Sequence, residues 1–177
     1  KGKGELEYLD SVLDSVSRAQ GDRDLEEIRQ ELVETGYLRR RGKAKDRMKR
    51  PATKPMEFRS TSGLRISVGR NNLQNDRLTT KQAGKWDYWF HTQKIHGAHV
   101  ILWTDGQKPD EQSLHEAACL AASFSQGSQG KKIPVDYTPV KFVKKPAGAR
   151  PGMVVYTTYE TAYVAPDGEL ARRLRVK

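Results

Sequence analysis

The sequence predicts an α+β fold, a mostly antiparallel sheet of about six strands with two packed helices, preceded by a short helical hairpin. Apolar residues recur at intervals of three and four near the amino terminus, and the interval changes to two after residue 56. A strongly basic stretch separates the two regions. We therefore divide the chain into a helical pair at 1–36 (the end of a coiled coil), a basic linker at 37–55 and an α+β body at 56–177.

The helical pair is expected from two short apolar series that Gly21 separates. Such spacing is typical of a helix that packs against a partner, as at the base of a coiled coil. Gly36 suits the left-handed residue that ends a helix. The apolar seams are expected at Leu6, Leu9, Leu13 and Val16 in the first helix and at Leu25, Ile28 and Leu32 in the second.

The body combines alternating strands with two helical segments. Strands are expected at 56–61, 64–69, 86–92, 98–104, 135–145 and 153–164, and helices at 71–82 and 109–124. The second helix carries an alanine-rich face that suits close packing on a sheet. Because the helices do not alternate regularly with the strands, the pattern indicates α+β rather than α/β.

Composition points to a phosphate-rich partner. The 177-residue chain has a formal net charge of +10, and residues 37–54 hold nine basic residues and one acidic residue. Cys119 is the single cysteine, which excludes a disulfide framework and a cysteine-based zinc site within one chain. No apolar run approaches the roughly 18 residues of a membrane span, and no signal peptide or lipid anchor is visible. We expect a cytoplasmic protein that binds nucleic acid and no membrane.

The densest polar feature is the stretch at 68–76, which places four amide side chains, an arginine and an aspartate around one leucine. Amides offer donors and acceptors on short arms and are suited to reading the polar edges of RNA bases. The alternative is structural, with Asn71, Asn75 and Asp76 capping and locking the turn after Gly69. Residues 39–54 have the same two interpretations, a phosphate-contacting arm or a solubilising tether.

A second dense feature is the aromatic stretch at 86–91. If it is a regular strand, Trp86, Tyr88 and Phe90 face the core, and the other three residues face outward. That outward set, Asp87, Trp89 and His91, is able to stack on a base and to hydrogen-bond its edge. Alternatively, Asp87 and His91 bond to each other or to loop amides.

Metal and catalytic interpretations have little support. His91, His96 and His99 lack a helical metal motif and an evident fourth ligand, so we expect no metal and no cofactor. A processing enzyme would need Asp76, Asp87 and His91 to converge, and no activated nucleophile motif accompanies them. We expect the chain not to be an enzyme.

Several of these stretches together resemble the NFACT-R family. The resemblance covers about 56–166 and rests on Phe58-Arg59, Gly63, Val68-Gly69-Arg70-Asn71-Asn72, Gln74-Asn75-Asp76, Leu78-Thr79, Lys81, Ala83, Asp87-Tyr88-Trp89-Phe90-His91, Gly97-Ala98-His99-Val100, Val135-Asp136-Tyr137-Thr138, Lys141, Val143-Lys144-Lys145-Pro146 and Pro151-Gly152. In that family the domain follows a coiled coil and forms the C-terminal part of ribosome quality-control factors such as RqcH and NEMF.

The resemblance implies an RNA-binding module that engages obstructed large ribosomal subunits, rRNA and tRNA, and supports mRNA-independent alanine tailing of stalled chains. It also keeps open a protein-interaction role, in which the helical pair docks a ribosomal protein or the domain acts as a fibronectin-binding adhesin. Candidate RNA-binding residues are Arg39, Arg40, Arg41, Arg70, Asn71, Asn72, Asn75, Asp76, Lys81, Asp87, Trp89, His91 and His99.

Overall fold

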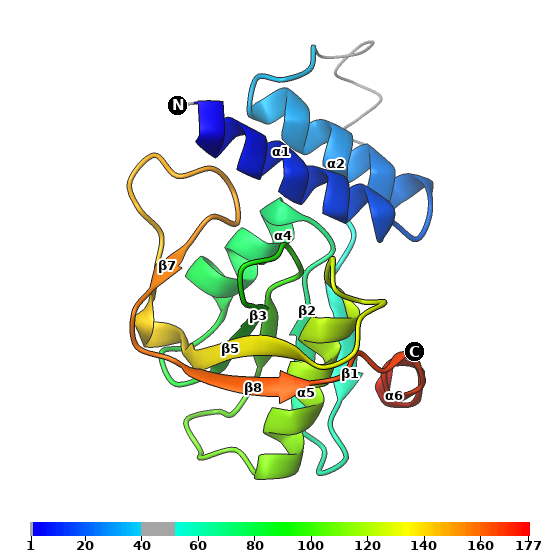
Figure 1. The fold of residues 1–177 in the computed structure, drawn as a ribbon, viewed down its shortest axis with the longest axis vertical. Coiled ribbons are helices and arrows are strands. Elements are labelled where there is room, and N and C mark those ends of the chain that lie inside the picture. Colours follow the sequence, from blue (N-terminus) through cyan, green and yellow to red (C-terminus); the bar gives the residue numbers. More distant parts are fainter. Residues whose placement is uncertain (1, 40–51) are drawn as a thin grey trace.

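The computed structural model describes residues 2–39 and 52–177 and confirms the α+β fold (Figure 1). Two helices, α1 (Gly2–Ser17) and α2 (Asp22–Glu34), lie at one end of a body built on a six-stranded sheet. Arg40, Arg41 and the rest of the linker up to residue 51 lie outside the described residues. No helix in the described ranges is long and apolar enough to cross a membrane.

The sheet is antiparallel throughout, in the order β1-β2-β4-β3-β5-β8. Its strands are β1 (Met56–Arg59), β2 (Arg65–Val68), β3 (Tyr88–Thr92), β4 (Val100–Leu102), β5 (Ile133–Pro139) and β8 (Glu160–Val164). Two shorter strands, β6 (Val143–Lys144) and β7 (Val155–Tyr156), form a separate ribbon. The predicted strands at 135–145 and 153–164 are thus each divided in two. Pro139, which has no amide hydrogen, ends β5, and a 3₁₀ turn (Val140–Phe142) follows it.

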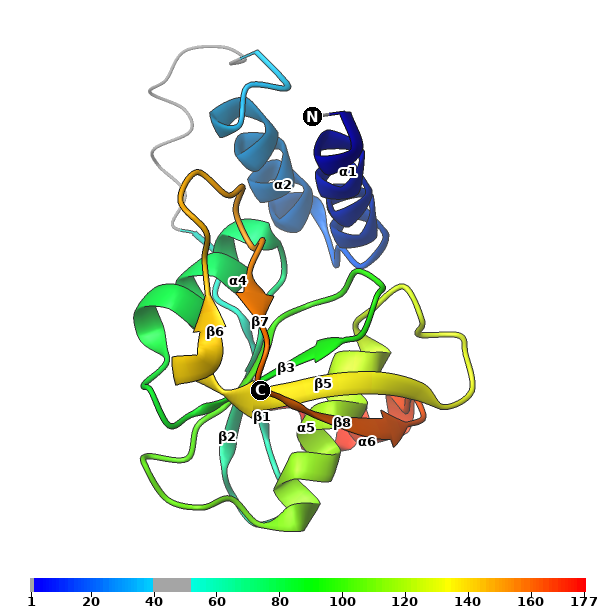
Figure 2. The same cartoon turned by 60° about the vertical axis from the view of Figure 1, so that its left-hand side comes forward.

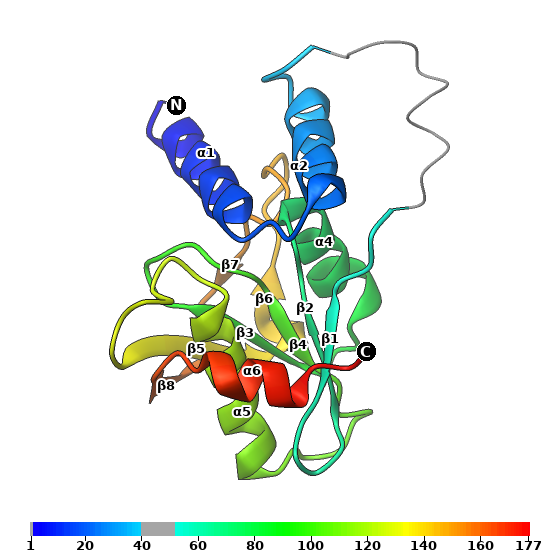
Figure 3. The same cartoon turned by 90° about the vertical axis from the view of Figure 1, so that its right-hand side faces the viewer.

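One face of the sheet packs against α5 (Glu111–Ser123), whose first turn is capped by Asp110 through the Ser113 amide. Alanines let this helix approach closely, and Ala117, Ala118 and Ala121 are fully buried. The C-terminal helix α6 (Gly168–Leu174), which the sequence pattern did not predict, lies beside α5 on the same face (Figure 3). After α6 the chain returns to β1, where the Val176 amide donates to the Glu57 carbonyl.

The other face is covered by α4 (Asn72–Arg77), the π-helix η1 (Leu78–Gln82) and the β6–β7 ribbon (Figure 2). The predicted helix at 71–82 with a polar cap is therefore confirmed. Leu78, Trp89, Ile101 and Val140 form a second buried cluster beneath these elements. Both faces of the central strands are therefore covered. A side chain on β3 that points away from α5 is covered by these elements and does not face solvent.

The helical pair is present, but its predicted apolar seam is only partly right: Ile28 is buried and Leu9 and Leu32 pack beside it, whereas other seam positions on α1 are exposed. Leu6 and Leu13 are 71% and 64% exposed. The face of α1 that lies inward instead carries Tyr8, Ser11, Val12 and Ser15. Its spacing of three and four is equally helical, so periodicity alone did not identify the buried face. Figure 3 shows the two helices diverging from their connecting turn, with the body beneath them.

Candidate functional site

The amide-rich stretch at residues 69–76, which we call the amide joint, fixes the helical pair on the body. Helix α2 directs Asp24, Glu27 and Glu31 toward it, three acids that share one helical face. The acids contact the joint in order along the helix: Asp24 pairs with Arg70 Nη1 at 3.3 Å, Glu27 accepts from Asn71 Nδ2 at 3.4 Å, and Glu31 accepts from Asn72 Nδ2 at 3.1 Å.

The same stretch also holds the body together. The Asn71 side chain accepts the Gln74 amide at 2.9 Å and caps α4, and Asn75 Oδ1 accepts the His99 amide at 3.1 Å. Asp76 accepts the Gly152 amide at 3.1 Å and pairs with Lys145 Nζ at 3.0 Å. Asn71 therefore has the capping role of the structural alternative, whereas Asn75 and Asp76 tie this stretch to segments elsewhere in the body.

Burial removes most of the amide joint from solvent. Asn71, Asn72 and Asn75 are each 4% exposed or less, and their polar atoms bond within the chain. Acids of α2 contact Asn71 and Asn72, and Asn75 bonds to the His99 amide, so these three amides lie inside the fold. Their expected contacts with RNA stay a prediction. Arg70 is likewise engaged by Asp24 and by the Lys54 carbonyl at 2.7 Å.

A buried acid lies at the centre of this interface. Glu31 is 1% exposed and accepts the Tyr8 hydroxyl as well as Asn72. Burial is the main cause of the raised pKa of Glu31, and the hydrogen bonds from Tyr8 and Asn72 oppose it. Burial likewise raises the pKa of the Tyr8 phenol. The helical pair therefore meets the body through polar groups withdrawn from water, a geometry that fixes a particular orientation.

The second predicted feature forms an internal aromatic cluster. Trp89 is 1% exposed and stacks on His91 with ring centroids 5.7 Å apart. Tyr156 of the ribbon meets the same indole edge-on at 4.7 Å. Trp89 is therefore not a surface stacking residue, contrary to the prediction, because the β6–β7 ribbon covers its side of β3.

The histidines of this cluster are held neutral. His99 Nδ1 lies 3.1 Å from the indole Nε1 of Trp89 and 2.7 Å from Thr79 Oγ1. Since the indole only donates, this ring nitrogen accepts, which assigns the proton to Nε2. Burial is the main cause that lowers the pKa of His91 to about 4 and holds the pKa of His99 well below 6.5.

The predicted acids do not converge on a reaction centre. Asp87 is buried and accepts the Gly84 and Thr104 amides, each at 2.8 Å, which confirms its alternative role of bonding loop amides. Asp76 instead bonds to the segment around Gly152. Across the described ranges, no group of three or more His, Cys, Asp and Glu side chains is placed to hold a metal.

The basic candidates lie on the surface. Lys81 is exposed at the end of η1, and Arg39 is exposed after α2. Their RNA contacts stay predictions, as do those of Arg40 and Arg41. Trp86, which strand alternation placed on the core face, is 53% exposed. Trp86 precedes the first paired residue of β3, so strand alternation does not apply to it. The sequence signal for an exposed Trp86 was its position directly after the basic residue Lys85.

The fold and this site define a basic α+β binding domain anchored to a helical pair through buried polar contacts. The chain belongs to the family of the NFACT protein RNA binding domain, whose sequence model matches residues 54–157. The model of the NFACT N-terminal and middle domains matches residues 1–51. The resemblance seen in the sequence is therefore confirmed.

Known proteins agree with this assignment. "Rqc2 homolog RqcH" of Bacillus subtilis is 44% identical over 97% of this chain and 30% of its own length, and the Streptococcus suis protein of the same name is 39% identical over the same shares. The chain thus spans about 30% of these curated relatives.

Two further proteins extend the comparison. The solved C-terminal structure of the fibronectin/fibrinogen-binding protein of S. suis superimposes with a TM-score of 0.88 at 37% identity, covering 98% of this chain and 68% of the other. "Coiled-coil domain-containing protein 25" of Bos taurus is 31% identical over 54% of this chain and 48% of its own length.

Proposed function

We propose that this chain is the RNA-binding module of a ribosome-associated quality-control factor. In this proposal it engages obstructed large ribosomal subunits and tRNA in the cytoplasm, and supports mRNA-independent alanine tailing of stalled nascent chains. The chain itself catalyses no reaction and holds no cofactor. The single observation that carries the proposal is the match to the NFACT RNA-binding family over residues 54–157.

Charge supports RNA as the partner. The chain carries 32 basic and 22 acidic residues. Six of the acids lie on helices α1 and α2 and already form ion pairs or hydrogen bonds within the fold: Glu5, Asp10, Asp14, Asp24, Glu27 and Glu31. At the amide joint Asp24 occupies Arg70, whereas Glu27 and Glu31 accept from the uncharged Asn71 and Asn72, so these two contacts use no basic side chain of the body.

Binding of tRNA and of rRNA fragments to the chain tests the RNA-binding part of the proposal. Affinity should decrease on the order of tenfold or more between about 50 and 200 mM salt if several phosphates are contacted. Absence of RNA binding at low salt would contradict the proposal.

The tailing role requires the longer protein context. A chimera in which this chain replaces the corresponding part of B. subtilis RqcH should sediment with large ribosomal subunits and restore alanine tails on a stalled reporter. A chimera that is stably expressed but stays off the subunits would contradict the role assigned to this chain.

A second candidate is protein binding, favoured by the likeness to the S. suis fibronectin/fibrinogen-binding protein. In that role the chain would bind fibronectin, or would dock a ribosomal protein through the helical pair. Such binding would survive high salt and ribonuclease treatment, whereas RNA-mediated association would be lost under both conditions. The two treatments therefore separate the two candidates.

A further inference from the structure

We propose that Lys85, Trp86, Lys141 and Phe142, the Trp86–Lys141 patch, form a contact site for an unpaired RNA base and its flanking phosphates. This inference rests on the proposed RNA-binding function and adds its location and the class of RNA structure it takes. It differs from the predicted site, whose stacking residue, Trp89, lies inside the fold.

The patch brings together two segments that are far apart in sequence. The Lys141 amide donates to the Lys85 carbonyl at 3.0 Å, and the Val140 amide donates to the Asp87 carbonyl at 2.8 Å. The Thr104 hydroxyl donates to the Trp86 carbonyl at 3.0 Å. Bonds on both sides of Trp86 therefore fix its backbone, so the point from which the indole projects is set before any ligand arrives.

The side chains offer an aromatic surface beside a cation. Trp86 is 53% exposed, and the Lys141 ammonium lies 4.5 Å from its ring centroid and 5.1 Å from that of Phe142. In the described part of the chain, neither Lys85 nor Lys141 forms an ion pair. Asp87, the acid next to Trp86, is buried and bonds to backbone amides.

This chemistry suits a base that is free of its own stack. Indole rings bind bases through their faces, which are accessible in single strands, loops and bulges but not within a regular duplex. A lysine without an acidic partner is able to meet a phosphate without first breaking an ion pair. The patch combines both properties, so RNA with an unpaired nucleotide is the ligand that it fits.

The test uses the 177-residue chain and two RNAs of the same base composition, one unstructured and one a fully paired blunt-ended stem without a loop. Trp86→Ala should weaken binding of the unstructured RNA by about tenfold, and Trp86→Phe should retain most of it. The effect on a fully paired stem should be small. Equal affinity of the wild type and Trp86→Ala for the unstructured RNA would overturn the proposal.

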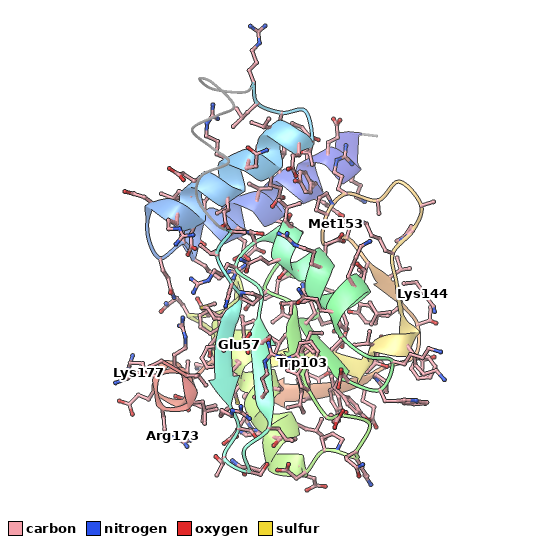
Figure 4. All side chains as sticks on the ribbon, turned by 180° about the vertical axis from the view of Figure 1, so that it is seen from behind. Glu57, Trp103, Lys144, Met153, Arg173 and Lys177 are labelled. Atoms are coloured by element: carbon pink, nitrogen blue, oxygen red, sulfur yellow. The ribbon has the colours of Figure 1, made fainter. Side chains whose placement is uncertain are left out.

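A charge-matched control separates the patch from general attraction. Lys141→Ala and Lys177→Ala each remove one positive charge, and Figure 4 places Lys177 at the opposite edge of the molecule from Lys144, which follows Lys141 by three residues. Lys141→Ala should weaken binding several-fold more than Lys177→Ala. Equal losses would overturn a specific site and leave only diffuse electrostatics.

Tryptophan fluorescence gives a readout that a structural role would not change. RNA that stacks on the exposed indole should quench emission in the wild type, and the quench should be lost in Trp86→Phe, which retains Trp89 and Trp103. A wild-type chain that binds no RNA would instead contradict the proposed function itself. If the patch variants lose a protein partner while RNA binding is unchanged, the patch serves that partner and the RNA assignment is wrong.

Discussion

Tyr8 of α1 donates its hydroxyl hydrogen to the carboxylate of Glu31 on α2, and both side chains are buried where the helical pair meets the body. Asn72 of the amide joint donates to the same carboxylate at 3.1 Å. Met153, labelled beneath the helices in Figure 4, packs in the small apolar cluster around Tyr8. Helix α1, helix α2 and the amide joint thus meet at one buried acid. We therefore expect the interface to depend strongly on Glu31.

Replacing Glu31 with alanine should lower the free energy of unfolding by about 2–4 kcal/mol, because the buried Tyr8 hydroxyl and Asn72 amide each lose the hydrogen bond to this carboxylate. Urea denaturation measures the change. Glu34→Ala is the matched control, since Glu34 lies on the same helix, is exposed, and should change stability by less than about 0.5 kcal/mol. Similar effects of the two substitutions would show that the Glu31 contacts contribute little.

The pH dependence of stability should report the titration of Glu31. Burial raises its pKa above the ordinary 4.5, so the folded protein holds this proton more tightly than the unfolded chain does. The contribution of Glu31 is therefore fully present below about pH 4.5 and declines as pH rises through the raised pKa. Denaturation of the wild type and Glu31→Gln at several pH values should show the wild type losing stability relative to the variant as pH rises. A pH-independent difference would contradict the raised pKa.

Gly69 and Asn75 should be energetically coupled. A Cβ at Gly69 would lie 1.9 Å from Asn75 Oδ1, the atom that accepts the His99 amide. Gly69→Ala should therefore destabilise the fold by about 2–3 kcal/mol. In an Asn75→Ala background the clash is relieved, so the same substitution should cost at least about 1 kcal/mol less. A double-mutant cycle by thermal or urea unfolding measures this coupling, and simple additivity would argue against it.

His91 and His99 should stay neutral over a wide pH range. The pKa of His91 is lowered to about 4 and that of His99 lies well below 6.5, chiefly through burial. Their ring-proton NMR shifts should remain constant from about pH 8 to pH 5.5. Because only the unfolded chain takes up these protons near pH 6.5, the free energy of unfolding should decrease as pH falls below that value. A titration midpoint near pH 6.5 for either ring would contradict its lowered pKa.

Local rules predicted most elements of the body correctly. Asn71 caps α4 as expected from its residue type, and the alanine-rich segment at 109–124 contains the helix that packs on the sheet. The prediction failed where the covering element came from elsewhere in the chain. Trp89 has the outward position that alternation assigns to it, yet Tyr156 of the ribbon covers it. Leu6 and Leu13 have helical spacing, yet they lie on the exposed side of α1.

The amino-acid sequence by itself determined the α+β class, the capped helix at the amide joint and the family resemblance, since each depends on residue types and their spacing along the chain. The three-part division by charge stays a prediction. Only the tertiary structure decided which polar groups face water. Asn72 and Glu31 are 41 positions apart, and their contact turns an amide suited to RNA into part of an internal joint. A side chain has a limited number of hydrogen-bonding positions, and the partner that occupies them is set by long-range packing.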